Sequence, residues 1–270
     1  MARKIAGGSR TGTALALWGA LALISAAGGA EGQQGQGAVP PLSAACDVPT
    51  ADIAAPASLP NLAAALRERK TARILAIGSS STAGVGASSN GKSYPSQLET
   101  ILEDALKGVD FVVLNRGVPG ELAQTAAERL KSEVALAAPD LVLWQLGTND
   151  ALARIAPSEF EATVLSTIRW LKDNRTDIVL VGPQYSPRFA RDPNYFAIRD
   201  SLQDIAAKEK ILYVRRYDAM QFIAQAHANL QLMARDNFHL NDLGYQCMAE
   251  HVAHAVIVSL FIKAPRPVGN

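Results

Sequence analysis

Residues 73–84 read RILAIGSSSTAG, an apolar run that passes directly into a turn of small residues. Such a short, nearly all-apolar run is typical of a strand in a parallel sheet whose two faces are both covered by helices. Four further runs have the same character: FVVL at 111–114, LVLWQL at 141–146, IVLV at 178–181 and ILYV at 211–214. The chain is therefore predicted to contain five buried strands, the first at 73–78.

Longer amphipathic stretches separate these runs and have the period and length of helices. They lie near residues 93–107, 121–138, 158–173 and 195–209, and a last one, 241–262, closes the chain. Strands and helices that alternate in this way predict a three-layer α/β/α fold with a doubly wound, parallel, five-stranded sheet. Ligands of such sheets bind beyond the carboxyl ends of the strands, so the turns after the strands are where a site is expected.

The N-terminal region has a different composition from the rest of the chain. Three basic residues among the first ten precede an apolar run at 14–24, and small residues follow up to residue 30. This pattern predicts a secretory signal peptide over residues 1–30, because the run is shorter than the roughly 20 residues that span a bilayer. An uncleaved membrane anchor is the alternative. We expect a secreted or periplasmic protein with no membrane span after cleavage.

The next segment, residues 31–45, is rich in Gly, Gln and Pro and is predicted to be a flexible linker. Residues 46–270 are predicted to form a single domain. The two cysteines of the chain are Cys46 and Cys247. An exported location permits a disulfide between them, and two separate thiols are the alternative.

The charge balance bears on possible partners. There are 26 Lys and Arg residues against 25 Asp and Glu residues in a chain of 270, so the formal net charge is +1. This balance offers no broad basic surface for nucleic acid. Hydrophobic residues make up 49% of the chain, which is compatible with a buried core and argues against disorder of the whole chain. We expect a protein that does not bind nucleic acid.

Polar and small residues gather after the predicted strands and near the C-terminus. The four segments are GSSSTAG at 78–84, NRGVPG at 115–120, GTND at 147–150 and DNFH at 236–239. This ordered set resembles the four blocks of the SGNH (GDSL-like) hydrolase family, which are centred on Ser, Gly, Asn and His. The resemblance runs from about residue 74 to residue 245 and implies a flavodoxin-like fold with esterase activity.

The resemblance also implies a role for each matching residue. Ser80 corresponds to the nucleophile, Asp236 and His239 to the acid and base, and Gly117 and Asn149, with the N–H of Ser80, to donors of an oxyanion hole. A serine hydroxyl needs such an imidazole to accept its proton, and a carboxylate to hold the imidazole in one tautomer. The backbone N–H groups and the Asn amide would donate to the negative oxygen of the tetrahedral intermediate.

One departure from the family pattern is that Ser79 stands where Gly-Asp-Ser has aspartate. We expect this substitution to affect the reactivity of the site and its substrate preference more than the type of reaction. Because three serines are adjacent, Ser79 or Ser81 is an alternative nucleophile. Asp236 and Asn149 could instead be simple turn or helix caps.

Two other patterns point to different chemistry. GASSNGKS at 86–93 satisfies the phosphate-binding P-loop pattern, but it does not follow a strand directly, so a nucleotide hydrolase is disfavoured. His251 and His254 have a spacing that could bind a metal, and a solvated helix face is the simpler reading. We expect neither a metal nor any other cofactor.

The substrate is less specified by the sequence. Tyr185, Arg188 and Phe189 follow the fourth strand and are candidates for substrate binding, although an ordinary surface loop is an equal alternative. The resemblance and the predicted export suggest short-chain, acetyl esters on an extracytoplasmic carbohydrate, in a small-molecule or polysaccharide substrate. A lipase, lysophospholipase or thioesterase of the same family is one alternative. A polysaccharide-binding module that has lost its chemistry is another.

Overall fold

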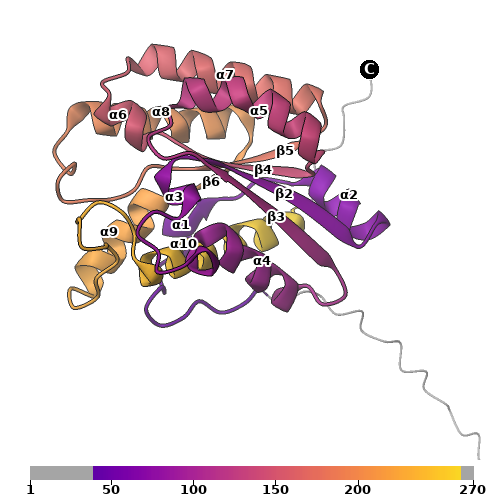
Figure 1. Cartoon of the computed structure of the whole chain (residues 1–270), viewed down its shortest axis with the longest axis horizontal. Helices are drawn as coiled ribbons and strands as arrows, with labels where there is room; N and C mark the ends of the chain where they lie inside the picture. The colour runs from indigo at the N-terminus through magenta and orange to yellow at the C-terminus, as the bar shows by residue number, and fades with distance from the viewer. Residues whose placement is uncertain (1–38, 263–270) are drawn as a thin grey trace, which may run out of the picture. The chain divides into compact units, whose positions relative to one another are not determined.

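The computed structural model describes residues 39–262, and Figure 1 shows their arrangement. The predicted signal peptide, residues 1–30, lies outside these residues. The five predicted strands are all present and pair in parallel. They are β2 (Thr71–Gly78), β3 (Asp110–Gly117), β4 (Leu141–Gln145), β5 (Asp177–Val181) and β6 (Leu212–Val214). The predicted α/β architecture is confirmed.

The sheet has one strand more than predicted. A short strand, β1 (Ala54–Ala55), pairs antiparallel with β6 at the edge, so the order is β1-β6-β5-β4-β2-β3. Two alanines carry no strand signal of their own, and their pairing with β6 makes them a strand. From β2 the chain moves to β3 on one side, then crosses to β4 on the other side and continues outward. Because this reversal occurs at β2, the carboxyl end of β2 is where a ligand site is expected.

Helices cover both faces of the sheet (Figure 1). One face carries α1 (Thr50–Ile53), α2 (Pro60–Glu68), α4 (Tyr94–Ala105), α9 (Arg216–Ala226) and α10 (Asp242–Leu260). The other carries α5 (Ala123–Ala137), α6 (Thr148–Leu152), α7 (Pro157–Asp173) and α8 (Pro193–Glu209). Two short turns, α3 (Ser80–Ala83) and η1 (Asn90–Lys92), follow β2. The short helices α1, α3 and α6, together with α2 and α9, were not predicted from the sequence.

The core consists of two apolar clusters, one on each face of the sheet. Along β4, Leu141 and Leu143 join one cluster while Val142 and Trp144 join the other. Successive side chains of a strand point to opposite faces, and both faces are covered here. This two-sided burial explains why β4 is apolar throughout instead of alternating.

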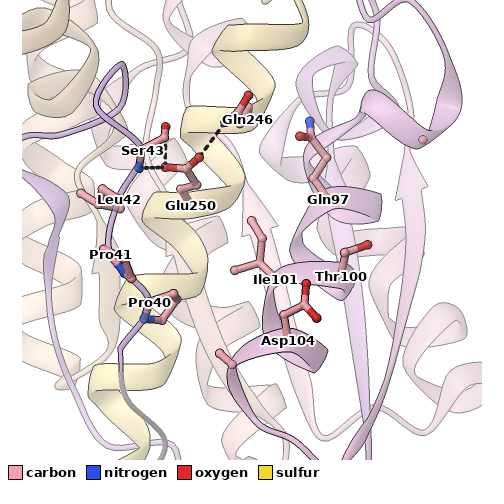
Figure 2. A pocket seen from close by; sticks show the side chains of 12 residues that line it. Pro40, Pro41, Leu42, Ser43, Gln97, Thr100, Ile101, Asp104, Gln246 and Glu250 are labelled. Atoms are coloured by element: carbon pink, nitrogen blue, oxygen red, sulfur yellow. Dashed lines mark hydrogen bonds between the residues drawn. The ribbon is translucent and has the colours of Figure 1, made fainter.

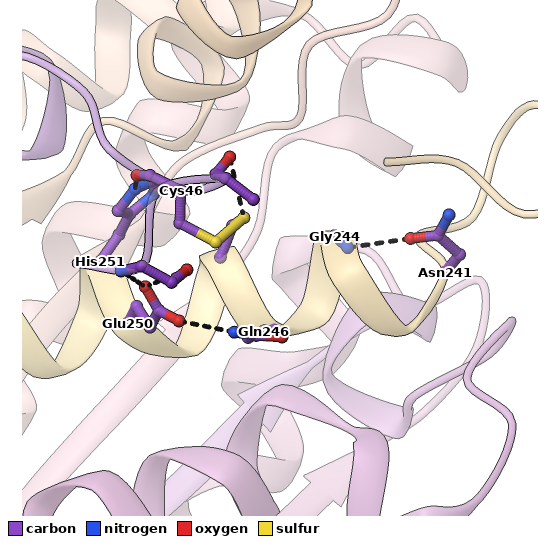
Figure 3. The surroundings of a disulfide bond; sticks show 9 residues. Cys46, Asn241, Gly244, Gln246, Glu250 and His251 are labelled. Atoms are coloured by element: carbon purple, nitrogen blue, oxygen red, sulfur yellow. Dashed lines mark hydrogen bonds between the residues drawn. A yellow bond between two sulfur atoms is a disulfide. The ribbon is translucent and has the colours of Figure 1, made fainter. Parts of the chain in front are cut away.

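A disulfide joins Cys46 to Cys247, as predicted, with the two α-carbons 4.9 Å apart. It ties the segment that precedes α1 to α10 (Figure 3). Next to it, the carboxylate of Glu250 accepts hydrogen bonds from the N–H and hydroxyl of Ser43, at 2.8 and 3.0 Å. The ring Nε2 of His251 lies 2.7 Å from the carbonyl oxygen of Cys46. The segment before the first helix is therefore held closely to α10.

Part of the segment predicted as a linker packs on the domain. Val39, Leu42 and Ala45 contact the apolar cluster on the α10 side. Residues 40–43 form one wall of a groove of about 780 Å³ whose other walls are α4 and α10 (Figure 2). Of the predicted linker, residues 39–45 therefore belong to the folded unit, and residues 31–38 lie outside the described part of the chain. Within residues 39–262, no helix has the length and apolar character needed to cross a membrane.

Candidate active site

Ser80 is the first residue of α3, directly after β2. The preceding glycine is required by packing, because a Cβ at Gly78 would lie 2.5 Å from the carbonyl oxygen of Gln145 on β4. Ser80 is 8% exposed. It therefore lies at the carboxyl end of β2, where the topology of the sheet places a ligand site.

The hydroxyls of the two neighbouring serines are engaged elsewhere. The N–H and Oγ of Ser79 both donate to Oε1 of Gln145, at 3.1 and 3.0 Å. Oγ of Ser81 accepts from Nη2 of Arg216 at 3.0 Å. Among the side-chain hydrogen bonds of residues 39–262, none involves Oγ of Ser80. Of the three adjacent serines, Ser80 is thus the one whose hydroxyl is available to react.

Asp236 and His239 form a hydrogen-bonded pair. Nδ1 of His239 lies 2.5 Å from Oδ2 of Asp236. The other oxygen, Oδ1, accepts from the backbone N–H groups of Phe238 and His239, both at 3.0 Å. The bond to His239, followed by these two N–H groups, lowers the pKa of Asp236 to about 2. Asp236 is therefore ionised at neutral pH and orients the imidazole.

The loop that carries His239 packs against the segment that follows Ser80. A Cβ at Gly86 would lie 2.5 Å from the carbonyl oxygen of Leu240 and 3.1 Å from Cβ of His239. The hydroxyl of Tyr245, on α10, donates to the carbonyl oxygen of Val85 at 2.7 Å. These contacts place the segment after Ser80 against the loop of His239, although about 160 residues of chain separate Ser80 from His239.

Asn149 lies in α6, against the turn that follows β3. Its Nδ2 donates to the carbonyl oxygen of Glu121 at 3.0 Å, which leaves the second N–H of the amide for another acceptor. The neighbouring Asp150 accepts from the N–H groups of Ala123 and Gly147, at 2.8 and 3.2 Å. Asp150 is buried, and burial raises the pKa of its carboxyl group. This carboxylate fastens the start of α5 to the turn that presents Asn149.

The structure corrects the role predicted for Gly117. Its N–H already donates to Oδ1 of Asn115 at 3.0 Å. A Cβ there would lie 2.1 Å from the backbone nitrogen of Ala83, so this glycine is needed for close packing against α3. An N–H with an intramolecular acceptor is not free for a substrate oxygen. Gly117 therefore supports the nucleophile turn instead of donating to an oxyanion.

A second glycine in the same turn, Gly120, is better suited than Gly117 to donate its N–H to an oxyanion. Its φ is +80°, and no atom lies within 4 Å of the position of a Cβ. Among residues 39–262, no acceptor is found for its N–H. The next residue, Glu121, holds the Asn149 amide. The signal in the sequence is the pair of glycines in NRGVPG, and the resemblance to the family block was placed on the first of them, Gly117.

The three predicted substrate-binding residues have different environments in the structure. Phe189 is 5% exposed and stacks on Tyr195 with ring centroids 5.1 Å apart, so it belongs to the core, and its predicted role is wrong. Tyr185 and Arg188 line a cavity of about 520 Å³ that Asp236 also borders. These two residues therefore adjoin the candidate site.

The segment with the P-loop pattern does not form a phosphate cradle after a strand. It contains the η1 turn, and the N–H and Oγ of Ser88 donate to the Asp242 carboxylate at 2.8 and 2.6 Å. The segment therefore fastens the nucleophile turn to the start of α10. Within residues 39–262, no three His, Cys, Asp or Glu side chains gather as a metal site would require.

Comparison with known proteins identifies relatives on this fold. The chain is 32% identical to an arylesterase of Vibrio mimicus over 124 residues, 44% of this chain and 60% of the relative. It is 28% identical to Esterase TesA of Pseudomonas aeruginosa over 142 residues, 52% of this chain and 68% of the relative. The structure of a variant of Axe2, an acetyl xylan esterase from Geobacillus stearothermophilus, is 21% identical with a TM-score of 0.59, covering 68% of this chain and 94% of that one.

A family model described as the Non-GDSL lipase-like family matches residues 45–260. A serine at position 79, in place of the aspartate of Gly-Asp-Ser, agrees with that description. The predicted resemblance to SGNH-type hydrolases is confirmed. Because the match covers most of the sequence, the chain belongs to the Non-GDSL lipase-like family.

Proposed function

We propose that this protein is a serine esterase that forms an acyl-enzyme on Ser80. The observation that carries the proposal is the hydrogen-bonded Asp236–His239 pair, whose loop packs against the segment after Ser80. A serine, an imidazole and a carboxylate in this order are the groups that acyl transfer requires.

In the first half of the reaction, Oγ of Ser80 attacks the carbonyl carbon of the ester. His239 accepts the hydroxyl proton through Nε2 while Asp236 stabilises the imidazolium. The carbonyl oxygen becomes negative in the tetrahedral intermediate and accepts from the N–H groups of Ser80 and Gly120 and from the Asn149 amide. The bond to the alcohol then breaks, and the imidazolium gives its proton to the leaving oxygen.

In the second half, water replaces the alcohol. His239 accepts a proton from the water as its oxygen attacks the acyl carbon. The bond between that carbon and Ser80 Oγ breaks, and the imidazolium returns the proton to Ser80. The carboxylic acid leaves, and the enzyme is restored. These steps use groups of this chain and water alone.

For the substrate, we propose short-chain esters, acetyl esters above all, of an extracytoplasmic carbohydrate. The likeness to an acetyl xylan esterase and the signal-peptide pattern of residues 1–30 support this class. The cavity beside Asp236 also supports this substrate class. Tyr185 and Arg188 line it with an aromatic ring and a hydrogen-bond donor, and both can contact a sugar ring. A lipase or thioesterase would instead need room for a long chain.

The test of the reaction is hydrolysis of p-nitrophenyl acetate by the wild type, by Ser80→Ala and by Ser132→Ala, each with and without a chelator. Ser132 is an exposed serine on α5 and is the matched control. We expect Ser80→Ala to lose activity by at least roughly 1000-fold, with Ser132→Ala and the chelated wild type unchanged. Equal activity of Ser80→Ala and the wild type would refute the assignment of the nucleophile.

The test of the substrate class is acetate release from acetylated xylan and mannan, compared with hydrolysis of p-nitrophenyl esters of increasing chain length. We expect acetate release and a fall in kcat/KM beyond about four carbons, since each added methylene needs its own apolar space. Rapid turnover of long-chain esters without acetate release would favour the lipase alternative. Export is checked by N-terminal sequencing of protein recovered outside the cytoplasm.

A further inference from the structure

A buried arginine lies directly beneath the nucleophile turn. Arg216, the first residue of α9, is 3% exposed. Its Nη2 donates to Oγ of Ser81 at 3.0 Å and to Oε1 of Gln184 at 2.9 Å. Within residues 39–262, Nε and Nη1 have no hydrogen-bond partner, and Arg216 forms no ion pair. A buried guanidinium without a carboxylate lowers stability, so a role in the site is the simplest reason for its presence.

Gln184 connects this arginine to the rest of the site. It is 2% exposed, and both its backbone and its side chain form hydrogen bonds. Nε2 donates to the carbonyl oxygen of Phe238 at 2.8 Å. Its N–H donates to Oγ1 of Thr148 at 3.3 Å, and its carbonyl oxygen accepts from the hydroxyl of Tyr195 at 2.6 Å.

The three segments reached by this pair are those of the proposed catalytic groups. Ser81 follows Ser80, Thr148 precedes Asn149, and Phe238 precedes His239. The segments come from three distant parts of the chain and belong to no common helix or strand. An amide carries a donor and an acceptor in one plane, and a guanidinium carries several donors in a rigid fork. Together they can fix the distances between segments that the backbone alone does not connect.

We propose that Arg216 and Gln184 form a positioning pair that fixes Ser80, Asn149 and His239 in their positions relative to one another. The pair acts through Ser81, Thr148 and Phe238 and does not touch the substrate. This proposal rests on the proposed function, because it assumes that those three residues perform the chemistry. A misplacement of about 1 Å between reacting groups can reduce the rate about 100-fold.

The test compares Arg216→Met and Gln184→Met with a control of similar character at the opposite edge of the sheet. The control is Asp177→Asn, because the buried Asp177 side chain also joins separate segments by hydrogen bonds, to Asn61 and Leu62. For each variant, kcat, KM, the thermal unfolding midpoint and the rate of Ser80 phosphonylation by a reactive phosphonate ester are measured. The fraction of molecules whose Ser80 is finally phosphonylated gives the concentration of folded enzyme, and kcat is calculated per folded molecule.

We expect the Met variants to lose roughly 10- to 100-fold in kcat and in the phosphonylation rate, with KM within about twofold of the wild type. Asp177→Asn is expected to lower the unfolding midpoint and keep its kcat. A merely structural role would lower stability in all three and leave kcat per folded molecule unchanged, which would overturn the proposal.

Gln184→Glu provides a second test if a Met variant does not fold. The carboxylate keeps an acceptor for Arg216 and forms an ion pair with it, but it has no donor for the Phe238 carbonyl. We expect this variant to fold and still to lose at least about tenfold in kcat, and a wild-type kcat would overturn the proposal. Failure of the proposed function is seen separately, because Ser80→Ala would then retain the activity of the wild type.

Discussion

At the scale of single residues, the site depends on which polar groups remain free after folding. Ser79 and Ser81 have bonded hydroxyls, and Ser80 is left between them. In the same way, the N–H of Gly117 donates to Asn115, while that of Gly120 has no acceptor among residues 39–262. Residues of one type that lie close together in the sequence therefore differ in whether their polar groups are free to contact a substrate.

The amide of Asn149 is the proposed oxyanion donor that mutation tests most directly. Replacement by alanine removes the amide and keeps the helix, since alanine is a good helix former. We expect kcat for p-nitrophenyl acetate to fall roughly 100- to 1000-fold with KM nearly unchanged. Gln124→Ala, an exposed amide at the start of α5, is the control. A fall of less than about threefold for Asn149→Ala would remove it from the oxyanion hole.

The two glycines of the β3 turn make a contrasting pair. Gly117→Ala places a methyl group 2.1 Å from the backbone of α3, so we expect a large loss of stability together with loss of activity. Gly120→Ala places its methyl group in open space, and the left-handed φ costs about 1–2 kcal/mol. Thermal unfolding of both variants measures the difference. Equal midpoints would contradict the packing role of Gly117.

At the scale of elements, the turns after β2, β3 and β5 are each fastened by a buried polar side chain. Gln145 holds the nucleophile turn, Asp150 holds α5 to α6, and Gln184 joins three segments. At the opposite edge of the sheet, Asp177 at the start of β5 accepts from the N–H groups of Asn61 and Leu62, at 2.9 and 3.0 Å. These two N–H groups lie in the first turn of α2 and have no partner within the helix, so Asp177 supplies their acceptor.

Asp177 makes stability depend on pH. Burial is the largest influence on this carboxyl group and raises its pKa to about 6, from 3.8. As the pH rises from about 4 to 6, the unfolded chain loses this proton while the folded chain retains it, so the free energy of unfolding falls. We expect the unfolding midpoint to decrease over this range and the decrease to be smaller in Asp177→Asn. An identical pH profile for the variant would contradict the shifted pKa.

At the scale of the whole molecule, the N-terminal segment and the last helix close the domain. The disulfide joins residues 201 positions apart and lies on α10, the helix that follows the His239 loop (Figure 3). Ser43 and Glu250 add hydrogen bonds beside it (Figure 2). The bridge therefore restricts nearly the whole described chain in its unfolded state.

Removal of both cysteines, as Cys46→Ala with Cys247→Ala, tests this contribution. A closed loop of this length is expected to contribute about 3–5 kcal/mol to the free energy of unfolding, chiefly by restricting the unfolded chain. Denaturant unfolding of the variant and the wild type measures the loss. We expect kcat at 20 °C to stay within about twofold, because the bridge does not touch the site. An unchanged free energy of unfolding would contradict this account.

Much of the fold could be predicted because its signals are local. The five parallel strands appear as short apolar runs, and the helices between them show the 3.6-residue period. Three of the missed elements, β1, α3 and α6, lack such signals, whereas α2 and α9 were missed although each is long enough to show one. β1 consists of two alanines that become a strand only by pairing with β6, and α3 and α6 are single turns at strand ends. The segment at 39–45 resembled a linker in composition, yet it is held by Glu250 and the disulfide.

The sequence alone predicted an SGNH-type esterase, because the segments that contain Ser80, Asn149, Asp236 and His239 resemble the blocks of that family in the same order. It also determined the fold class, through periodicity. Only the tertiary structure decided which glycine N–H is free, that Phe189 belongs to the core, and that Arg216 and Gln184 lie beneath the site. The physical reason is that hydrogen bonding and burial depend on contacts between distant segments, which no local pattern in the sequence specifies.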